Sequence, residues 1–244
     1  MDGQPTRGGE AALTPAGPRA FFAFLRRPVL PERVVGLRLS ALRGTLGLFV
    51  LDLAMMAVLV SLALVAWLLG FTLPSSVVGE LKMGAGLVAL IVVFAPIGEE
   101  LIFRSWLSGR PGHVGAAAVL LAAIGYLLTA DLKAHPLLLL GALAGGLVLA
   151  IGLAVGLRRR ARFGFFARHF AWFYFASAAA FALVHLSNYS SGAAAVLLPL
   201  VLPQLLVGLI LGYARVTYGL WSNILLHMMH NGLLITVVLL IASF

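Results

Sequence analysis

Apolar residues follow one another along most of this 244-residue chain in runs that are long enough to cross a bilayer. Seven such runs lie at roughly 46–70, 84–108, 114–130, 136–157, 169–187, 193–213 and 220–241. An apolar run of about twenty residues spans the hydrocarbon core as an α-helix, whose backbone groups satisfy one another without water. The pattern therefore predicts an all-α protein, a polytopic transmembrane helical bundle of about seven spans over residues 46–241.

Composition strengthens this prediction and narrows the chemistry. The chain is 62% hydrophobic and only 10% charged, which lies outside the range of soluble domains. Its net charge of +9 comes from short arginine stretches between apolar runs, with no basic face interleaved with aromatic residues, so we expect no nucleic-acid partner. The absence of cysteine excludes a thiol nucleophile and thiolate zinc sites.

The segment before the first span divides into two parts. Residues 1–18 are rich in glycine, proline and small polar residues, and they predict a disordered tail without a signal peptide. Residues 19–43 interleave phenylalanine, leucine and valine with six arginines, which is typical of an interfacial amphipathic segment on an anionic leaflet. A solvated linker is the alternative. Membrane lipids are thus the expected partners of this region.

The basic residues also predict an orientation. Arginines precede the first span, close the second, fill the loop after the fourth and precede the last, which places them all on one side of the membrane. Lys82 and Lys133 fall in the opposite loops. The positive-inside rule therefore predicts a cytosolic N-terminus and an exoplasmic C-terminus, and we expect an integral protein of the cell (plasma) membrane.

Three charged residues interrupt the second span. Glu99, Glu100 and Arg104 lie in the run APIGEELIFRSWL, and each costs about 2.5 to 3.5 kcal/mol at the bilayer centre on insertion scales. Glu100 and Arg104 are four residues apart, so they can pair on one helix face, whereas Glu99 points about 100° away. We expect one glutamate to hold the arginine and the other to stay free for a functional partner. A purely structural ion-pair cluster is the alternative.

Two later spans carry matching polar groups. The fifth contains Phe181 and His185, and the seventh contains His227 and Asn231, each pair at the four-residue spacing that shares a helix face. Counted from the expected cytosolic boundary at about 1.5 Å per residue, Glu99, His185 and His227 all lie about 13 to 17 Å deep. These groups therefore predict one water-filled pocket. The polar stretch SNYSSG directly after His185 implies a short helix, a local water-filled dip, or a span boundary that lies elsewhere.

This set of side chains fits peptide hydrolysis by activated water. A buried glutamate beside a neutral histidine can hold and deprotonate a water, and a second histidine with an asparagine can stabilise the oxyanion that the attack creates. His230 competes with His227 for the second role but has no polar residue four positions later. Asp52, near the cytosolic end of the first span, is expected to snorkel or pair.

The same residues resemble the motifs of a known family. EELIFR, FALVH and HMMHN are similar to the EExxxR, FxxxH and HxxxN motifs of the CPBP family, which comprises type II CAAX prenyl endopeptidases and bacteriocin-processing enzymes. The resemblance covers about residues 84–241 and implies an all-helical intramembrane endopeptidase acting on a membrane-associated peptide or protein. It implies that Glu99 and His185 activate water and that His227 and Asn231 bind the oxyanion, with Glu100 and Arg104 completing the site.

One departure and several alternatives accompany this resemblance. Glu99 and His185 are 86 residues apart, which accommodates two additional spans at 114–157 and puts the shape of the pocket in question. Glu99, His185 and His227 can supply a zinc site with an open water position, although we favour a metal-free mechanism, and no HExxH helix is present. A proton-coupled transporter and a non-catalytic membrane scaffold are the other hypotheses, and no inverted repeat supports the transporter.

Overall fold

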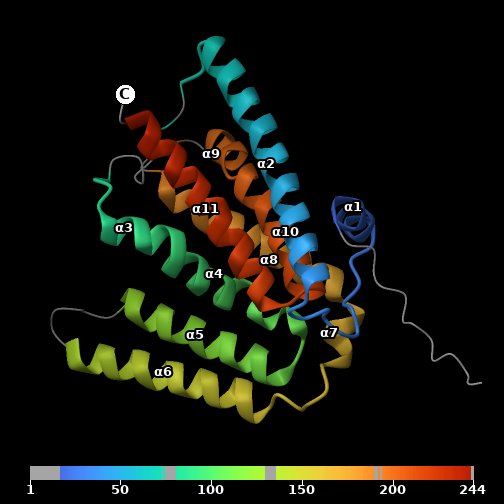
Figure 1. The fold of residues 1–244 in the computed structure, drawn as a ribbon. Helices are drawn as coiled ribbons and strands as arrows, with labels where there is room; N and C mark the ends of the chain where they lie inside the picture. The colour runs from blue at the N-terminus through green and yellow to red at the C-terminus, as the bar shows by residue number, and fades with distance from the viewer. Residues whose placement is uncertain are drawn as a thin grey trace, which may run out of the picture.

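The computed structural model describes residues 17–72, 74, 81–129, 136–189, 192 and 194–242, and these form helices with no β-strand. The long helices are α2 (Leu39–Leu68), α5 (Pro111–Thr129), α6 (Pro136–Gly156), α8 (Phe170–Val184), α10 (Leu202–Thr217) and α11 (Leu220–Ala242), as Figure 1 shows. The remaining elements are α1 (Pro18–Arg26), α3 (Ala85–Ala89), the π-helix η2 (Leu90–Phe94), α4 (Ala95–Phe103), α7 (Gly164–Arg168), α9 (Ala194–Leu200) and the 3₁₀ helices η3 (Ser105–Ser108) and η4 (His185–Asn188).

The predicted helical bundle is confirmed. Within the described residues, six helical segments are long and apolar enough to cross a membrane, at 39–68, 85–103, 111–129, 136–156, 170–188 and 220–241. The sixth predicted run, 193–213, forms two shorter helices, α9 and α10, which are separated at Val201 because Pro203, near the start of α10, has no amide hydrogen to continue α9. The chain is therefore an integral membrane protein with an all-helical fold.

The segment before the first span differs in detail from its prediction. Residues 1–16, most of the predicted tail, lie outside the described residues. α1 follows and buries Phe21, while the ring of Phe24 lies 5.1 Å from that of Tyr174 and 5.0 Å from that of Tyr213. α2 begins at Leu39, inside the segment predicted as interfacial. The amphipathic segment thus packs part of its apolar face on the bundle, and its contact with lipid stays a prediction.

Two helices from opposite ends of the chain run side by side. The hydroxyls of Thr45 on α2 and Ser222 on α11 lie 2.7 Å apart, and Asp52 and His230 are joined further along the same two helices. Residue numbers rise in the same direction in both contacts, so α2 and α11 are parallel, and Figure 1 shows them together. Parallel first and last spans agree with an odd number of crossings.

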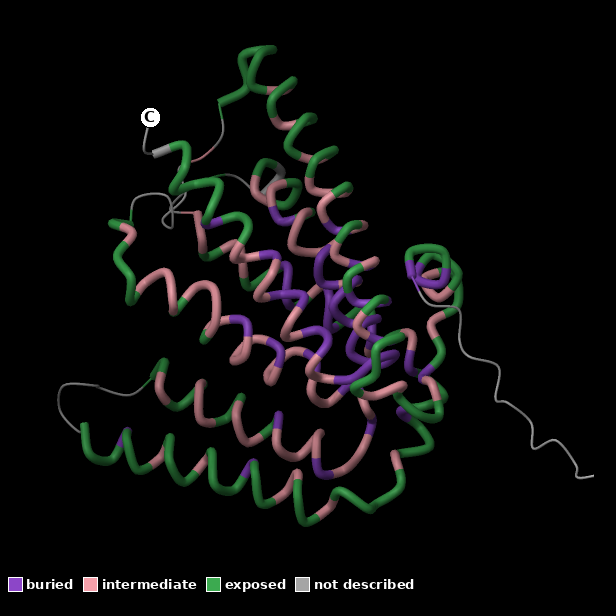
Figure 2. Tube along the Cα trace, viewed as in Figure 1, coloured by how far each residue is buried: buried purple, intermediate pink, exposed green. Residues whose placement is uncertain are grey.

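Burial is concentrated at one end of the bundle. Figure 2 shows most buried residues around α10, where it contacts α8, α11 and the first half of α2, whereas α6 is largely exposed and α5 is mostly of intermediate exposure. Small residues make the close approach possible: a Cβ added at Gly212 would lie 2.8 Å from the ring of Tyr174, and one at Gly44 would lie 2.3 Å from the hydroxyl of Tyr218. The charged residues of the second span belong to this buried end.

Candidate active site

A π-helix directly precedes α4, the helix that carries the two glutamates, and a proline in the sequence explains where it ends. The amide of Ala95 bonds to the carbonyl of Leu90, five residues back, so the next bond of this type would join residue 96 to Ile91. Residue 96 is proline, which has no amide hydrogen. The side-chain amide of Asn231 donates to the Ile91 carbonyl instead, at 2.9 Å. Asn231 therefore supplies the donor that Pro96 lacks and fixes α11 against the start of α4.

Glu100 is the centre of a fully buried polar group. Arg104, four residues later and directly after the end of α4, donates from Nη1 to Oε1 of Glu100, which confirms the predicted pair. The side-chain amide of Asn223 on α11 donates to Oε2. His227 Nδ1 lies 2.9 Å from Oε1, and because a carboxylate only accepts, this nitrogen carries a hydrogen. Three donors from two helices thus hold one carboxylate.

Two further side chains hold the end of α4. Arg215 on α10 is buried and donates to the carbonyls of Arg104 and Ser105, at 3.1 and 2.8 Å. The hydroxyl of Ser177 on α8 donates to the carbonyl of Phe103 at 2.6 Å. Helix ends leave carbonyls without intrahelical partners, so these donors make a buried ending acceptable. They also fix the depth of α4 relative to α8 and α10.

Glu99 occupies a different environment from Glu100. Its Oε2 lies 3.7 Å from His227 Nε2, too far for a direct hydrogen bond, and its side chain is 31% exposed. Oε2 itself is buried and has no hydrogen-bond partner among the described residues. Glu99 and Glu100 therefore flank one imidazole, with Glu100 fixing Nδ1 and Glu99 facing Nε2. A carboxylate oxygen without a partner beside this ring is a position where a polar ligand would be bound.

His185 lies across an aromatic ring from His227. The ring of Phe181 is 4.6 Å from that of His185 and 5.7 Å from that of His227, and the Arg104 guanidinium lies 4.0 Å from its centroid. His185 Nδ1 is 2.7 Å from the Phe181 carbonyl and donates to it, so the neutral ring presents Nε2 as an acceptor. α8 ends at Val184, directly before His185, and the chain continues as η4 to Asn188, so the segment 170–188 is still long enough to cross a membrane.

The predicted site residues are thus brought together in part. Glu99, Glu100, Arg104 and His227 form one contact group, and Asn231 contacts the π-helix that leads into it. Among the described residues, no hydrogen bond or ion pair joins His185 to Glu99. A single cavity shared by Glu99, His185, His227 and Asn231 therefore stays a prediction.

The sequence interpretation overlooked Asn223, although a signal for it exists. Asn223 precedes His227 by four residues, so Asn223, His227 and Asn231 form one polar stripe on α11. The sequence motif includes only His227 and Asn231. An asparagine near the start of an apolar helix, such as Asn223, is also compatible with an interfacial position. Its contact with Glu100 assigns it to the buried group.

The described residues do not form a ready zinc site. No group of three or more His, Cys, Asp or Glu side chains in this part of the chain is arranged to hold a metal ion. Glu99 and His227 provide two donors, whereas Nδ1 of His227 is already bound to Glu100. A catalytic zinc normally takes three protein ligands. The zinc interpretation thus lacks its third ligand in this arrangement.

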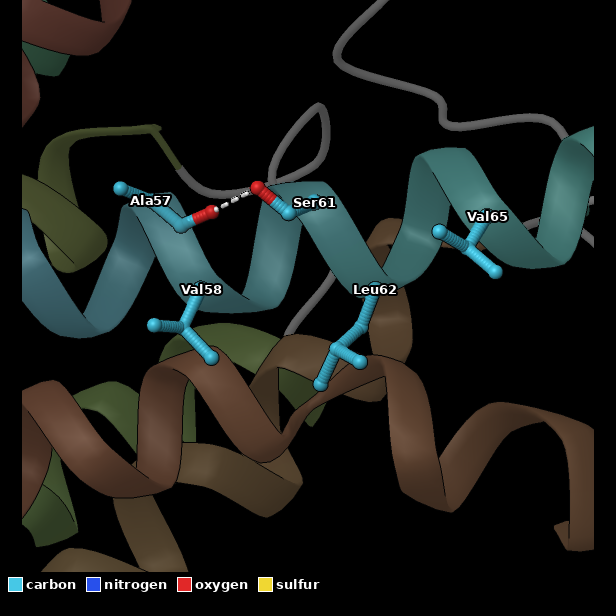
Figure 3. Close-up of a pocket in the computed structure, with 5 residues that line it drawn as sticks. All are labelled: Ala57, Val58, Ser61, Leu62 and Val65. Carbon is cyan, nitrogen blue, oxygen red and sulfur yellow. Dashed lines mark hydrogen bonds between the residues drawn. The ribbon is translucent and has the colours of Figure 1, made fainter.

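An apolar pocket lies elsewhere and carries no ionisable group. It follows one side of α2 and is lined by Ala57, Val58, Ser61, Leu62 and Val65, as Figure 3 shows. The only side-chain hydroxyl there, that of Ser61, donates back to the Ala57 carbonyl at 2.8 Å. This pocket cannot support acid–base chemistry, so the polar group on α4 and α11 remains the candidate site.

Comparison with known proteins yields one match. The family model described as "Type II CAAX prenyl endopeptidase Rce1-like" matches residues 81–233. No curated protein and no solved structure matches the chain. The matched region covers more than half of the chain and contains every charged or imidazole group of the site described above, from Glu99 to His227.

Proposed function

Because this chain belongs to the Rce1-like family of type II CAAX prenyl endopeptidases, we propose that it hydrolyses a peptide bond of a membrane-associated substrate with water activated by Glu99. Glu99 is suited to this role because it is the only glutamate of the EExxxR motif that is not already held by Arg104 and Asn223. A general base must have a free carboxylate within reach of the water that it deprotonates. Its exposure also gives a substrate access to it.

In the proposed reaction, Glu99 carries a proton from the attacking water to the leaving nitrogen. Glu99 takes a proton from the water while the water oxygen attacks the peptide carbonyl carbon, and His185 Nε2 accepts the water's other hydrogen bond. Glu99 then gives its proton to the leaving amide nitrogen as the carbon–nitrogen bond breaks. The Phe181 carbonyl supports this role of His185, because it holds the hydrogen on Nδ1 and leaves Nε2 as an acceptor.

His227 and Asn231 are proposed to stabilise the oxyanion. His227 can donate from Nε2 only when both ring nitrogens carry hydrogens, since Nδ1–H is already given to Glu100. That doubly protonated ring is positive and lies between two carboxylates. Asn231 uses one amide hydrogen on Ile91 and keeps a second for a ligand. Preorganised donors of this kind typically contribute about 10² to 10³ to the rate each.

The observation that carries the proposal is the asymmetry of the two glutamates. Adjacent carboxylates that served only to balance Arg104 would share its guanidinium. Here one is fully buried with three donors, and the other has an unpartnered oxygen 3.7 Å from an imidazole nitrogen. Holding an unpaired carboxylate in this position is costly unless it binds something, which favours a catalytic role.

The direct test is peptide cleavage by the purified protein in lipid vesicles. Prenylated and unprenylated CAAX peptides and a general peptide library are the substrates, and Glu99→Gln keeps the shape of the side chain while it removes the base. We expect kcat to fall by about two to four orders of magnitude. Glu32→Gln is the matched control, because Glu32 is exposed and lies before the first span. This variant should cleave the peptides at the wild-type rate.

Full activity of Glu99→Gln would refute the proposed base. Proton flux across vesicles without any cleavage would favour the transporter hypothesis, and folded protein with neither property would favour the scaffold. Comparing prenylated with unprenylated peptides also decides whether the substrate must carry a lipid.

A further inference from the structure

A second buried acid–imidazole pair lies outside this site, where α2 packs beside α11. His230 Nδ1 is 2.7 Å from Asp52 Oδ2, and a ring nitrogen at this distance from a carboxylate donates its hydrogen. The Asp52 side chain has no exposed surface and that of His230 is 11% exposed. Ionisable residues inside transmembrane helices are expensive, so the pair requires an explanation.

Stability alone does not explain the pair. The second oxygen of Asp52, Oδ1, is buried and has no hydrogen-bond partner among the residues that the structure describes. Buried ion pairs with unsatisfied atoms are generally no more stabilising than apolar side chains of similar size. Their best-attested use is to fix how two helices are aligned.

The position of His230 on α11 indicates that the pair affects the orientation of the site residues on this helix. It follows His227 by three residues and directly precedes Asn231, so all three lie within about one helical turn. Asp52, in contrast, lies outside residues 81–233, the region that the family model matches. A helix from outside the matched core therefore reaches the turn of α11 that carries the site.

We propose that Asp52 and His230 are positioning residues whose hydrogen bond fixes the rotation of α11 about its own axis, so that His227 faces Glu99. The effect on catalysis rests on the proposed function, whereas the effect on helix position does not. Side-chain atoms lie about 6 Å from a helix axis, so a rotation of about 10° moves them by about 1 Å. A misplacement of that size can lower a catalysed rate by about 100-fold.

The first test separates the hydrogen bond from the charge. Asp52→Leu and His230→Leu remove the acceptor and the donor, and each should lower kcat by about 100-fold while KM changes less than about 3-fold. Asp52→Asn keeps an acceptor and His230→Gln keeps a donor, so both should retain at least about a tenth of wild-type kcat. The double leucine variant should be no slower than either single one, because both changes break the same bond.

Thr45→Val is the matched control. It removes the other polar contact between α2 and α11, that of Thr45 with Ser222, and keeps the shape of the side chain. If any loosening of α2 from α11 affected catalysis, Thr45→Val would lower kcat as strongly as Asp52→Leu, and the proposed role would be overturned. We expect Thr45→Val to keep kcat within about 3-fold of wild type, since its contact lies two turns from His230.

The second test needs no peptidase activity. The chain has no cysteine, so an introduced pair of cysteines can be crosslinked selectively. A Cβ at Gly232 would lie 3.5 Å from Cγ1 of Val92 in the π-helix, so cysteines at these two positions report on the rotation of α11. We expect Val92→Cys with Gly232→Cys to form a disulfide under mild oxidation, and the added Asp52→Leu to slow it at least about 10-fold. Unchanged crosslinking with Asp52→Leu overturns the positioning role. If the wild-type protein cleaves no peptide but Asp52→Leu still slows the crosslinking, only the proposed function is refuted.

Discussion

Replacing Arg104 by methionine removes the guanidinium but keeps most of the apolar stem. Breaking a buried ion pair from one side typically costs about 3 to 5 kcal/mol, and the contact of the guanidinium with the Phe181 ring, at 4.0 Å, adds up to about 2 kcal/mol. Glu100 nevertheless keeps its donors Asn223 and His227, which offset part of the loss. We expect a net destabilisation of about 3 kcal/mol.

Thermal unfolding in lipid nanodiscs measures this loss. For a chain of this size about 3 kcal/mol lowers Tm by about 6 to 12 °C. Glu100→Gln combined with Arg104→Met leaves no unpaired charge and should be at least about 1 kcal/mol more stable than Arg104→Met alone. Arg168→Met, at an exposed arginine of α7, is the control and should stay within about 0.5 kcal/mol of wild type. A double variant no more stable than Arg104→Met would show that Glu100 is not the group left uncompensated.

Three further predictions follow from the contacts described above. A reporter after Phe244 should be exoplasmic and one inserted near Arg160 cytosolic, and finding both on the same side would overturn the proposed seven-span orientation. Gly112→Ala should lower Tm because its Cβ would lie 2.6 Å from a backbone oxygen of α6, whereas Gly141→Ala, with open space around it, should not. Asn223→Leu should lower kcat by about 10-fold or more by releasing one side of Glu100, and activity equal to wild type would show that Arg104 and His227 position it unaided.

Hydropathy was sufficient to predict six of the seven spans as long apolar helices, and four-residue spacing was sufficient to predict one contact of the site. Apolar runs predict helix positions well because the bilayer admits few alternatives to a continuous helix. The pairing of Glu100 with Arg104 followed from four-residue spacing, which is a property of the helix itself.

Contacts between helices were less predictable. Asp52 and His230 are 178 residues apart, and no local pattern in either helix identifies the other as its partner. The π-helix was not predicted because its residues are as apolar as those of an α-helix; Pro96 is compatible with a kink, a break or a π-helix. The bond from the Ala95 amide to the Leu90 carbonyl, five residues back, identifies the π-helix, and the sequence alone does not predict it.

The two additional spans, α5 and α6, pack away from the hydrogen bonds that hold Glu100. α5 and α6 pack mainly on each other, and Arg110 closes their base by donating to the Arg158 carbonyl at 2.6 Å. They reach the rest of the bundle at η3 and α4, and Figure 1 shows them together on one side of it. Among the described residues, the side-chain hydrogen bonds to Glu100 come from Arg104 at the end of α4 and from Asn223 and His227 on α11. A hairpin of two spans returns the chain to the same side of the membrane. α8 therefore crosses the membrane in the same direction as it would without α5 and α6, and His185 stays at the same end of α8. The hairpin therefore packs beside α4 and η3 without contributing to the hydrogen bonds that the described residues make to Glu100.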